Sequence, residues 1–281
     1  MRVSRKDYPI QDDSAERISR TEFDTSSSET LEVFYSLNFG NSKFGRVTKP
    51  ISFRASVLTR FLVEHKRLVF MASLLLSLIV RSPIPDDEIR RIKLEKFVST
   101  GDFVFEIGSN KGGLTLILSR LVGASGRVVS FEPNLVSYSL LRAYTRNLRN
   151  ISCYNLGFGP TEGTGSLYLQ GPTDKAARAE PVSGKGRIHV EFTMTTIDLF
   201  IQKSAIIPSI IMIDAEGAEA EVLIGAEITL STIQPTVVLQ LHGISDDRFA
   251  KVMRLLSSKG FDSQVLYSDG VMNCILLFSR R

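Results

Sequence analysis

The residues best suited to binding chemistry lie between Val104 and Gly113, where the sequence reads VFEIGSNKGG. Glycine allows a sharp backbone turn and a close approach to a ligand, because it has no Cβ. A dinucleotide-binding turn would read G-x-G-x-x-G and hold a pyrophosphate at the start of the following helix. Here Asn110 stands where that pattern needs its second glycine, and glycines fall at Gly108 and Gly112. The spacing argues against a pyrophosphate ligand.

Two glutamates flank this turn. Glu106 directly precedes it, and a carboxylate there would repel a pyrophosphate but could bind the ammonium group of an amino acid. Glu132 ends the next apolar stretch, where its carboxylate could accept hydrogen bonds from a ribose diol. Each has an alternative role. Glu106 could be a structural carboxylate that satisfies the N–H groups of the turn, and Glu132 could be a solvated acid.

Further candidates follow two other apolar stretches, SIIMI and TVVLQL. Asp214 and Glu216 come after the first, and His242 after the second. His242 is the first candidate for a general base because histidine titrates near neutral pH, and Asp214 is the second. Alternatively, His242 caps a loop. No metal site is predicted, although Asp214 and Glu216 could together hold a divalent cation. Glu219 is expected to be solvated or structural.

These candidates need a fold that brings strand ends together. Short apolar strands alternate with helical patterns from Phe103 onward, which predicts an α/β fold with a doubly wound, mostly parallel sheet buried on both faces. The last two strands have no helix between them and should form an antiparallel hairpin. Ligands of such sheets lie outside the carboxyl ends of the strands. The predicted helices span 86–98, 113–122, 135–148, 196–203, 218–230 and 246–258, and residues 171–187 are predicted to form a loop.

The chain divides into three parts. Residues 1–30 are polar and predict a disordered tail, residues 31–85 a helical N-terminal extension, and residues 86–281 the catalytic domain. Within the extension, a basic run leads into Leu68–Val80, thirteen residues without a charge. This stretch is too short to cross a membrane, and a buried helix is favoured over an interfacial anchor. Peripheral contact of residues 43–80 with anionic lipid remains the alternative.

Composition sets further limits. The net charge of +4 and the pI near 9.1 are too modest to indicate a nucleic-acid partner. Cys153 and Cys274 do not suggest a disulfide framework, and no secretory signal begins the chain. We therefore expect a cytoplasmic protein, with membrane association as the alternative noted above. The oligomeric state is left open.

Three ordered stretches resemble the FkbM family of methyltransferases: FEIGSNKGGLTLILSRLVGASGRVVSFEPN, VEFTMTTIDLF and IMIDAEGAEAEVLIGAE. The resemblance covers roughly residues 100–245. It implies a Rossmann-like class I methyltransferase fold and transfer of a methyl group from S-adenosyl-L-methionine, generally to oxygen on sugars, polyketides or other small molecules. The implied cofactor contacts are Glu106, Gly108, Asn110 and Gly112 at the methionine end and Glu132 at the ribose. Asp214 follows a neighbouring strand, and the topology predicts that it lies at the same edge, beside the sulfonium.

The chain departs from the family pattern at two places. Lys111 replaces a smaller or apolar residue in the turn, and Gly157-Phe-Gly-Pro replaces an acid that often contacts adenine. Two other functions compete with a methyltransferase that acts on a small-molecule or glycan hydroxyl. One is a nicotinamide-dependent oxidoreductase. The other is a non-catalytic, membrane-associated module on the same fold.

Overall fold

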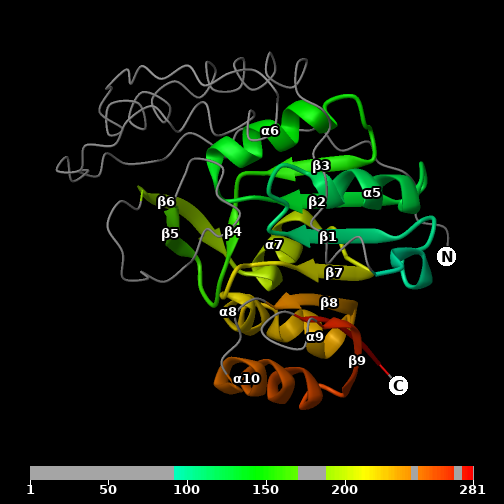
Figure 1. Ribbon diagram of the computed structural model, residues 1–281, viewed down its shortest axis with the longest axis vertical. Helices are drawn as coiled ribbons and strands as arrows, with labels where there is room; N and C mark the ends of the chain where they lie inside the picture. Colours follow the sequence, from blue (N-terminus) through cyan, green and yellow to red (C-terminus); the bar gives the residue numbers. More distant parts are fainter. Residues whose placement is uncertain (1–91, 170–187, 242–245, 269–273, 281) are drawn as a thin grey trace, which may run out of the picture.

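The computed structural model describes residues 92–169, 188–241, 246–268 and 274–280 (Figure 1). Several predictions concern residues outside these ranges and stay predictions. They are the tail at 1–30, the extension at 31–85 with its membrane contact at 43–80, the loop at 171–187, and His242.

A seven-stranded mixed sheet carries the candidate site. Its order is β3-β2-β1-β7-β8-β10-β9. Strands β3, β2, β1, β7 and β8 run parallel, and β10 is antiparallel to both β8 and β9. The predicted doubly wound sheet with a terminal antiparallel hairpin is confirmed. The strands are β1 (Phe103–Ile107), β2 (Arg127–Phe131), β3 (Ile151–Tyr154), β7 (Ile210–Ile213), β8 (Thr236–Leu241), β9 (Phe261–Ser268) and β10 (Cys274–Arg280).

Helices cover both faces of this sheet (Figure 1). Successive strand residues point to opposite faces, so Val104 packs in one apolar cluster with Leu118 of α5, while Phe105 packs in another with Leu223 of α8. Burial on both faces explains why the parallel strands are nearly continuous apolar runs. The helices are α5 (Gly113–Val122), α6 (Leu135–Thr145), α7 (Ile197–Ser204), α8 (Glu219–Ile224), α9 (Glu227–Thr232) and α10 (Asp246–Ser257).

Two predicted helices differ from the structure. The described part of the helix expected at 86–98 contains only a short 3₁₀ turn, η1 (Leu94–Lys96). The helix expected at 218–230 is divided into α8 and α9. At the break, a Cβ on Gly225 would overlap the Gly159 carbonyl, and the Asp198 carboxylate caps α9 by accepting the N–H groups of Ile228 and Thr229. Tertiary contacts therefore override a continuous helical pattern.

A second, three-stranded sheet was not predicted as a unit. Its order is β4-β6-β5. The side chain of Phe192 covers Gly157 and Gly165, where any Cβ would overlap the ring. The sequence did not indicate this packing, because glycines such as Gly157 and Gly165 occur singly and do not show which side chain covers them. The strands are β4 (Gly157–Phe158), β5 (Gly163–Leu169) and β6 (Ile188–Thr195).

The helices within the described ranges are short relative to the thickness of a bilayer. None of them combines the length and the hydropathy that a membrane crossing requires. The apolar segment Leu68–Val80 lies outside those ranges.

Candidate functional site

The turn between β1 and α5 requires glycine at two positions. Gly108 has φ +87°, and a Cβ there would overlap the carbonyl oxygen of Asp214 on the neighbouring strand end. Gly112 has φ +90° and immediately precedes α5, where a Cβ would lie 2.7 Å from Cδ1 of Leu141. Both backbone conformations are in the left-handed region that glycine adopts without a steric penalty. The turn can therefore lie directly against β7 and α6.

Four N–H groups of this turn donate within the protein. Those of Gly108 and Ser109 donate to the Phe131 carbonyl, each at 3.0 Å, and that of Gly112 donates to the Ser109 carbonyl at 2.9 Å. The Asn110 N–H donates to Oε2 of Glu132 at 2.8 Å. A pyrophosphate site depends on such N–H groups pointing at the ligand. In this turn these four donors are already used.

Glu106 is the most deeply buried acid of the site, with 2% of its surface exposed. Its Oε2 accepts hydrogen bonds from the hydroxyls of Thr115 at 2.6 Å and Ser130 at 2.7 Å. Its Oε1 is buried and has no hydrogen-bond partner among the described residues. Burial raises the pKa of Glu106 from 4.5 to about 7. One carboxylate oxygen is thus held by hydroxyls while the other remains available to a donor.

Glu132 takes the structural role that was considered for Glu106, because it is Glu132 that accepts N–H groups of the turn. Its Oε1 accepts the Asn134 N–H at 2.7 Å, and its Oε2 accepts the Asn110 N–H. It is not a solvated acid, since only 7% of its surface is exposed, and burial raises its pKa to about 7. Each carboxylate oxygen can accept a second hydrogen bond, so both functions are compatible.

Asn110 contributes a second available acceptor. Its backbone adopts φ +48°, and its Oδ1 is buried with no hydrogen-bond partner within the described part of the chain. Asparagine tolerates this left-handed conformation better than most residues. Buried polar atoms in native proteins nearly always have partners, so an orphaned acceptor is a specific feature. The turn therefore combines orphaned acceptors with occupied donors, which suits a ligand that donates hydrogen bonds.

An aromatic cluster supports the strand end that carries Glu132. The Phe131 ring packs edge-on against Phe158 at 4.7 Å and Phe200 at 4.8 Å between centroids, and it stacks on Tyr154 at 5.6 Å. Next to it, Asn155 Nδ2 donates to the Glu132 and Pro133 carbonyls. This packing restricts the movement of the β2 terminus. The sequence alone did not indicate it.

Asp214 lies at the end of β7, next to the turn. Its N–H donates to the Ile107 carbonyl at 2.9 Å, and its side chain is half-buried. Its negative charge contributes to the raised pKa of both Glu106 and Glu132, so three acids share one edge of the sheet. Glu216 follows in a left-handed turn with φ +47°. In the ranges that the structure describes, no three His, Cys, Asp or Glu side chains form a metal-binding group.

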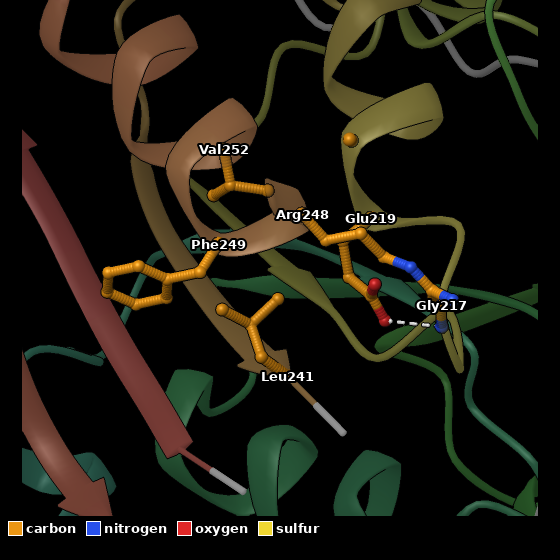
Figure 2. A pocket seen from close by; sticks show the side chains of 7 residues that line it. Gly217, Glu219, Leu241, Arg248, Phe249 and Val252 are labelled. Atoms are coloured by element: carbon orange, nitrogen blue, oxygen red, sulfur yellow. Dashed lines mark hydrogen bonds between the residues drawn. The ribbon is translucent and has the colours of Figure 1, made fainter. Parts of the chain in front are cut away.

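A small pocket opens beside this loop, between the start of α8, the end of β8 and the start of α10 (Figure 2). Glu219 is 4% exposed and accepts the Gly217 N–H at 2.9 Å, so its role is structural rather than solvated. Arg248 lies over the same turn, and a Cβ on Gly217 would come within 2.8 Å of its Nη1. Leu241, Phe249 and Val252 provide the apolar wall.

Sequence reasoning missed the residues that hold the acids in place. Thr115 and Ser130 bind Glu106, and Arg248 covers the turn after β7. A signal for Ser130 was present: it interrupts the apolar strand VVSF and is in register with Glu106 on the neighbouring strand. The contacts of Thr115 and Arg248 depend on helix packing and had no such signal.

This topology and the acid-flanked glycine turn define a Rossmann-like class I methyltransferase fold. The family described as Methyltransferase FkbM domain matches residues 106–263, more than half of the chain. The chain therefore belongs to the FkbM methyltransferase family, and the resemblance noted in the sequence is confirmed. The cofactor of this family is S-adenosyl-L-methionine.

Solved structures match this chain at low sequence identity. The FkbM methyltransferase from Methylobacillus flagellatus KT is 14% identical with a TM-score of 0.49, and the match covers 78% of this chain and 60% of that one. Fibrillarin from Aeropyrum pernix, in complex with S-adenosyl-L-methionine, is 13% identical with a TM-score of 0.44, covering 68% and 73%. The chain thus spans about three fifths of the first protein's length. No conclusion about substrate rests on these similarities.

Proposed function

We propose that this protein transfers a methyl group from S-adenosyl-L-methionine to a hydroxyl group of a small molecule or glycan. The observation that supports this most is the chemistry of the β1–α5 turn. Its orphaned acceptors, Glu106 Oε1 and Asn110 Oδ1, match a ligand that carries an ammonium group, and four of its N–H groups are occupied. A pyrophosphate-bearing nicotinamide cofactor would need the opposite arrangement.

Different residues of the site would bind different parts of the cofactor. Glu106 and Asn110 would accept hydrogen bonds from the methionine ammonium, and Glu132 would accept hydrogen bonds from the ribose hydroxyls through its remaining lone pairs. Gly108 and Gly112 leave room for a close approach of the ligand to the backbone. The bound cofactor supplies an electrophilic methyl group on a sulfonium. The negative charges of Glu106, Glu132 and Asp214 favour a cationic ligand at this edge.

The acceptor hydroxyl must lose its proton as it is methylated, which requires a base at the same edge. Asp214 is half-buried at the end of β7 and is one candidate. His242 is the other and directly follows β8 in the sequence. Replacing His242 with alanine should lower turnover and leave cofactor affinity intact. If turnover stays near normal, the base is Asp214 or solvent. Asp214→Asn would then distinguish these two, because it lowers turnover only if Asp214 is the base.

Two experiments test the proposal. Isothermal titration with S-adenosylhomocysteine and with NAD should give binding to the first ligand only, and binding of NAD alone would favour an oxidoreductase. Incubation with radiolabelled S-adenosyl-L-methionine and fractionated cell extract should then label a product whose methyl group is on oxygen. A methyl group on nitrogen or carbon would contradict the oxygen-directed part, and no labelled product would favour a non-catalytic module.

A further inference from the structure

The edge of the sheet opposite the cofactor turn carries a cluster of arginines. Arg120 is at the end of α5, Arg127 begins β2, and Arg149 precedes β3. Parallel strands β1, β2 and β3 all start at this edge, which lies away from the β1–α5 turn (Figure 1). Arg120 and Arg149 are exposed, and Arg127 is half-buried. The described residues include no carboxylate that forms an ion pair with any of the three.

Asn150 ties together the three chain segments that carry the arginines. Its Nδ2 donates to the carbonyls of Ser119 at 2.8 Å and Gly123 at 3.0 Å, and its Oδ1 accepts the Ser119 hydroxyl at 2.8 Å. Its own carbonyl accepts the Val128 N–H at 2.8 Å. Each arginine is therefore the chain neighbour of Asn150 or of a residue bonded to it. The cluster is fixed by the fold.

Large apolar side chains are exposed at the same edge. Phe103 pairs in register with Arg127 and is 38% exposed, as is Leu148 near Arg149. Ile207 is 59% exposed and lies two residues before Ser209, which exchanges hydrogen bonds with Phe103. Isolated exposed apolar residues are normal, but three beside an arginine cluster form a mixed basic and apolar surface. We name these six residues the amino-edge patch.

Within the ranges that the structure describes, nearby charges do not neutralise the patch. Lys93 and Lys96, both exposed, flank Glu95 in and beside η1. The other acid is Asp102, whose carboxylate accepts the Ser99 N–H at 2.7 Å and the Ser209 hydroxyl at 2.9 Å. Among the described residues of this region, five cations therefore face two acids, and one of those acids, Asp102, holds the segment that leads into β1.

From this geometry we propose that the amino-edge patch docks the domain on an anionic lipid surface. Basic side chains near a membrane are attracted to anionic headgroups, and apolar side chains beside them insert at the headgroup boundary. A nucleic acid would match the arginines but not the exposed Phe103, Leu148 and Ile207. Docking through this edge leaves the acidic cofactor edge on the opposite side of the sheet. Lipid docking does not depend on methyl transfer, and this proposal would stand even if the protein did not transfer a methyl group.

The test uses the full chain and vesicle sedimentation. The protein should bind phosphatidylglycerol vesicles, should not bind phosphatidylcholine vesicles, and should dissociate as salt increases. Replacing Arg120 and Arg149 together with glutamine should weaken binding by about 25-fold, or about fivefold for each charge. Lys251→Gln with Arg254→Gln removes the same charge from α10 and should change binding less than twofold. Unchanged melting temperature and S-adenosylhomocysteine affinity would show that the variants are folded.

A third variant separates lipid from other polyanions. Ile207→Ser should weaken vesicle binding by about threefold to tenfold, because an inserted apolar side chain is lost, and should not affect binding of a single-stranded RNA. Three results would overturn the proposal: no binding to phosphatidylglycerol, equal losses in the patch and α10 variants, or RNA binding that depends on Arg120 and Arg149 without vesicle binding. The proposal would also be overturned if substitutions at Lys43, Arg46 and Lys49 abolished vesicle binding and the substitutions in the patch did not.

Discussion

The two edges of the central sheet have opposite chemistry. At the carboxyl edge, Glu106, Glu132 and Asp214 lie close together, and the two glutamates are buried with pKa values raised to about 7. At the amino edge, Arg120, Arg127 and Arg149 lie at the surface with apolar neighbours. The difference teaches that burial determines what a charge can do. A buried acid needs specific partners and suits a specific ligand, whereas exposed cations act through their summed charge on a broad surface.

The sequence contains the same asymmetry. Between Gly108 and Thr161, the only acid is Glu132, while lysine and arginine occur at 111, 120, 127, 142, 146 and 149. The parallel topology sorts most of these residues, because strand ends and helix starts meet at one edge and strand starts and helix ends at the other; Lys111, in the β1–α5 turn, is the exception. Four experiments test this difference between the two edges.

The largest effect is expected at the glycine turn. Gly108→Ala should lower the free energy of unfolding by about 4 kcal/mol and abolish S-adenosylhomocysteine binding, since the new Cβ would overlap the Asp214 carbonyl. Gly260→Ala is the matched control, because Gly260 has φ +84° but no atom within 4 Å of the position that a Cβ would take. It should cost about 1–2 kcal/mol from backbone strain alone. Equal costs in denaturant unfolding would contradict the close approach at Gly108.

The next effect concerns pH. A carboxyl group whose pKa is raised from 4.5 to about 7 on folding stabilises the protein most below pH 4.5, and this contribution is lost as pH rises to about 7. The unfolding free energy of the ligand-free protein should therefore fall across this interval by on the order of 3 kcal/mol for each of the two glutamates. Glu106→Gln should reduce the fall. Conversely, the affinity for S-adenosylhomocysteine should rise as the pH rises through about 7, because the glutamates then become ionised. An affinity that does not change with pH would count against ionised glutamates as ligands of the cofactor.

Removal of Glu132 should have a moderate effect on the ligand. Glu132→Ala is expected to weaken cofactor binding by about 1–3 kcal/mol, the range for a lost hydrogen bond to a charged group. Isothermal titration measures this loss, and Glu162→Ala serves as the control because Glu162 is exposed and paired with Lys203. Unchanged affinity in the Glu132 variant would remove this residue from the cofactor site.

The smallest effect on cofactor binding is expected at the amino edge. Asn150→Ala removes three side-chain hydrogen bonds and should lower the free energy of unfolding by about 2 kcal/mol. Cofactor affinity should stay the same, because the lost contacts join α5 to β3 at the far edge from the turn. Thermal unfolding and titration with S-adenosylhomocysteine check both parts. A loss of affinity as large as that of Glu132→Ala would show that the two edges are coupled.

Much of the fold was predictable because its signals are local. The first strand of the sheet begins at Phe103, and the helix Gly113–Val122 has the bounds that apolar periodicity predicted. The helix predicted at 196–203 corresponds to α7, and Thr196 caps it, since its hydroxyl accepts the Leu199 N–H at 3.0 Å. The helix predicted at 218–230 is divided by long-range contacts, because Asp198 caps α9 from 30 residues away in the sequence.

The family, the seven-stranded sheet and the acids of the turn could be predicted from the sequence, because they depend on residue type and spacing along the chain. Only the tertiary structure decided which oxygen of each glutamate is occupied, since Thr115, Ser130 and Asn134 approach from different elements. It also decided that three arginines, spread over thirty residues, form one surface. Hydrogen-bond partners and surface patches are properties of proximity in space, which residue spacing along the chain does not specify.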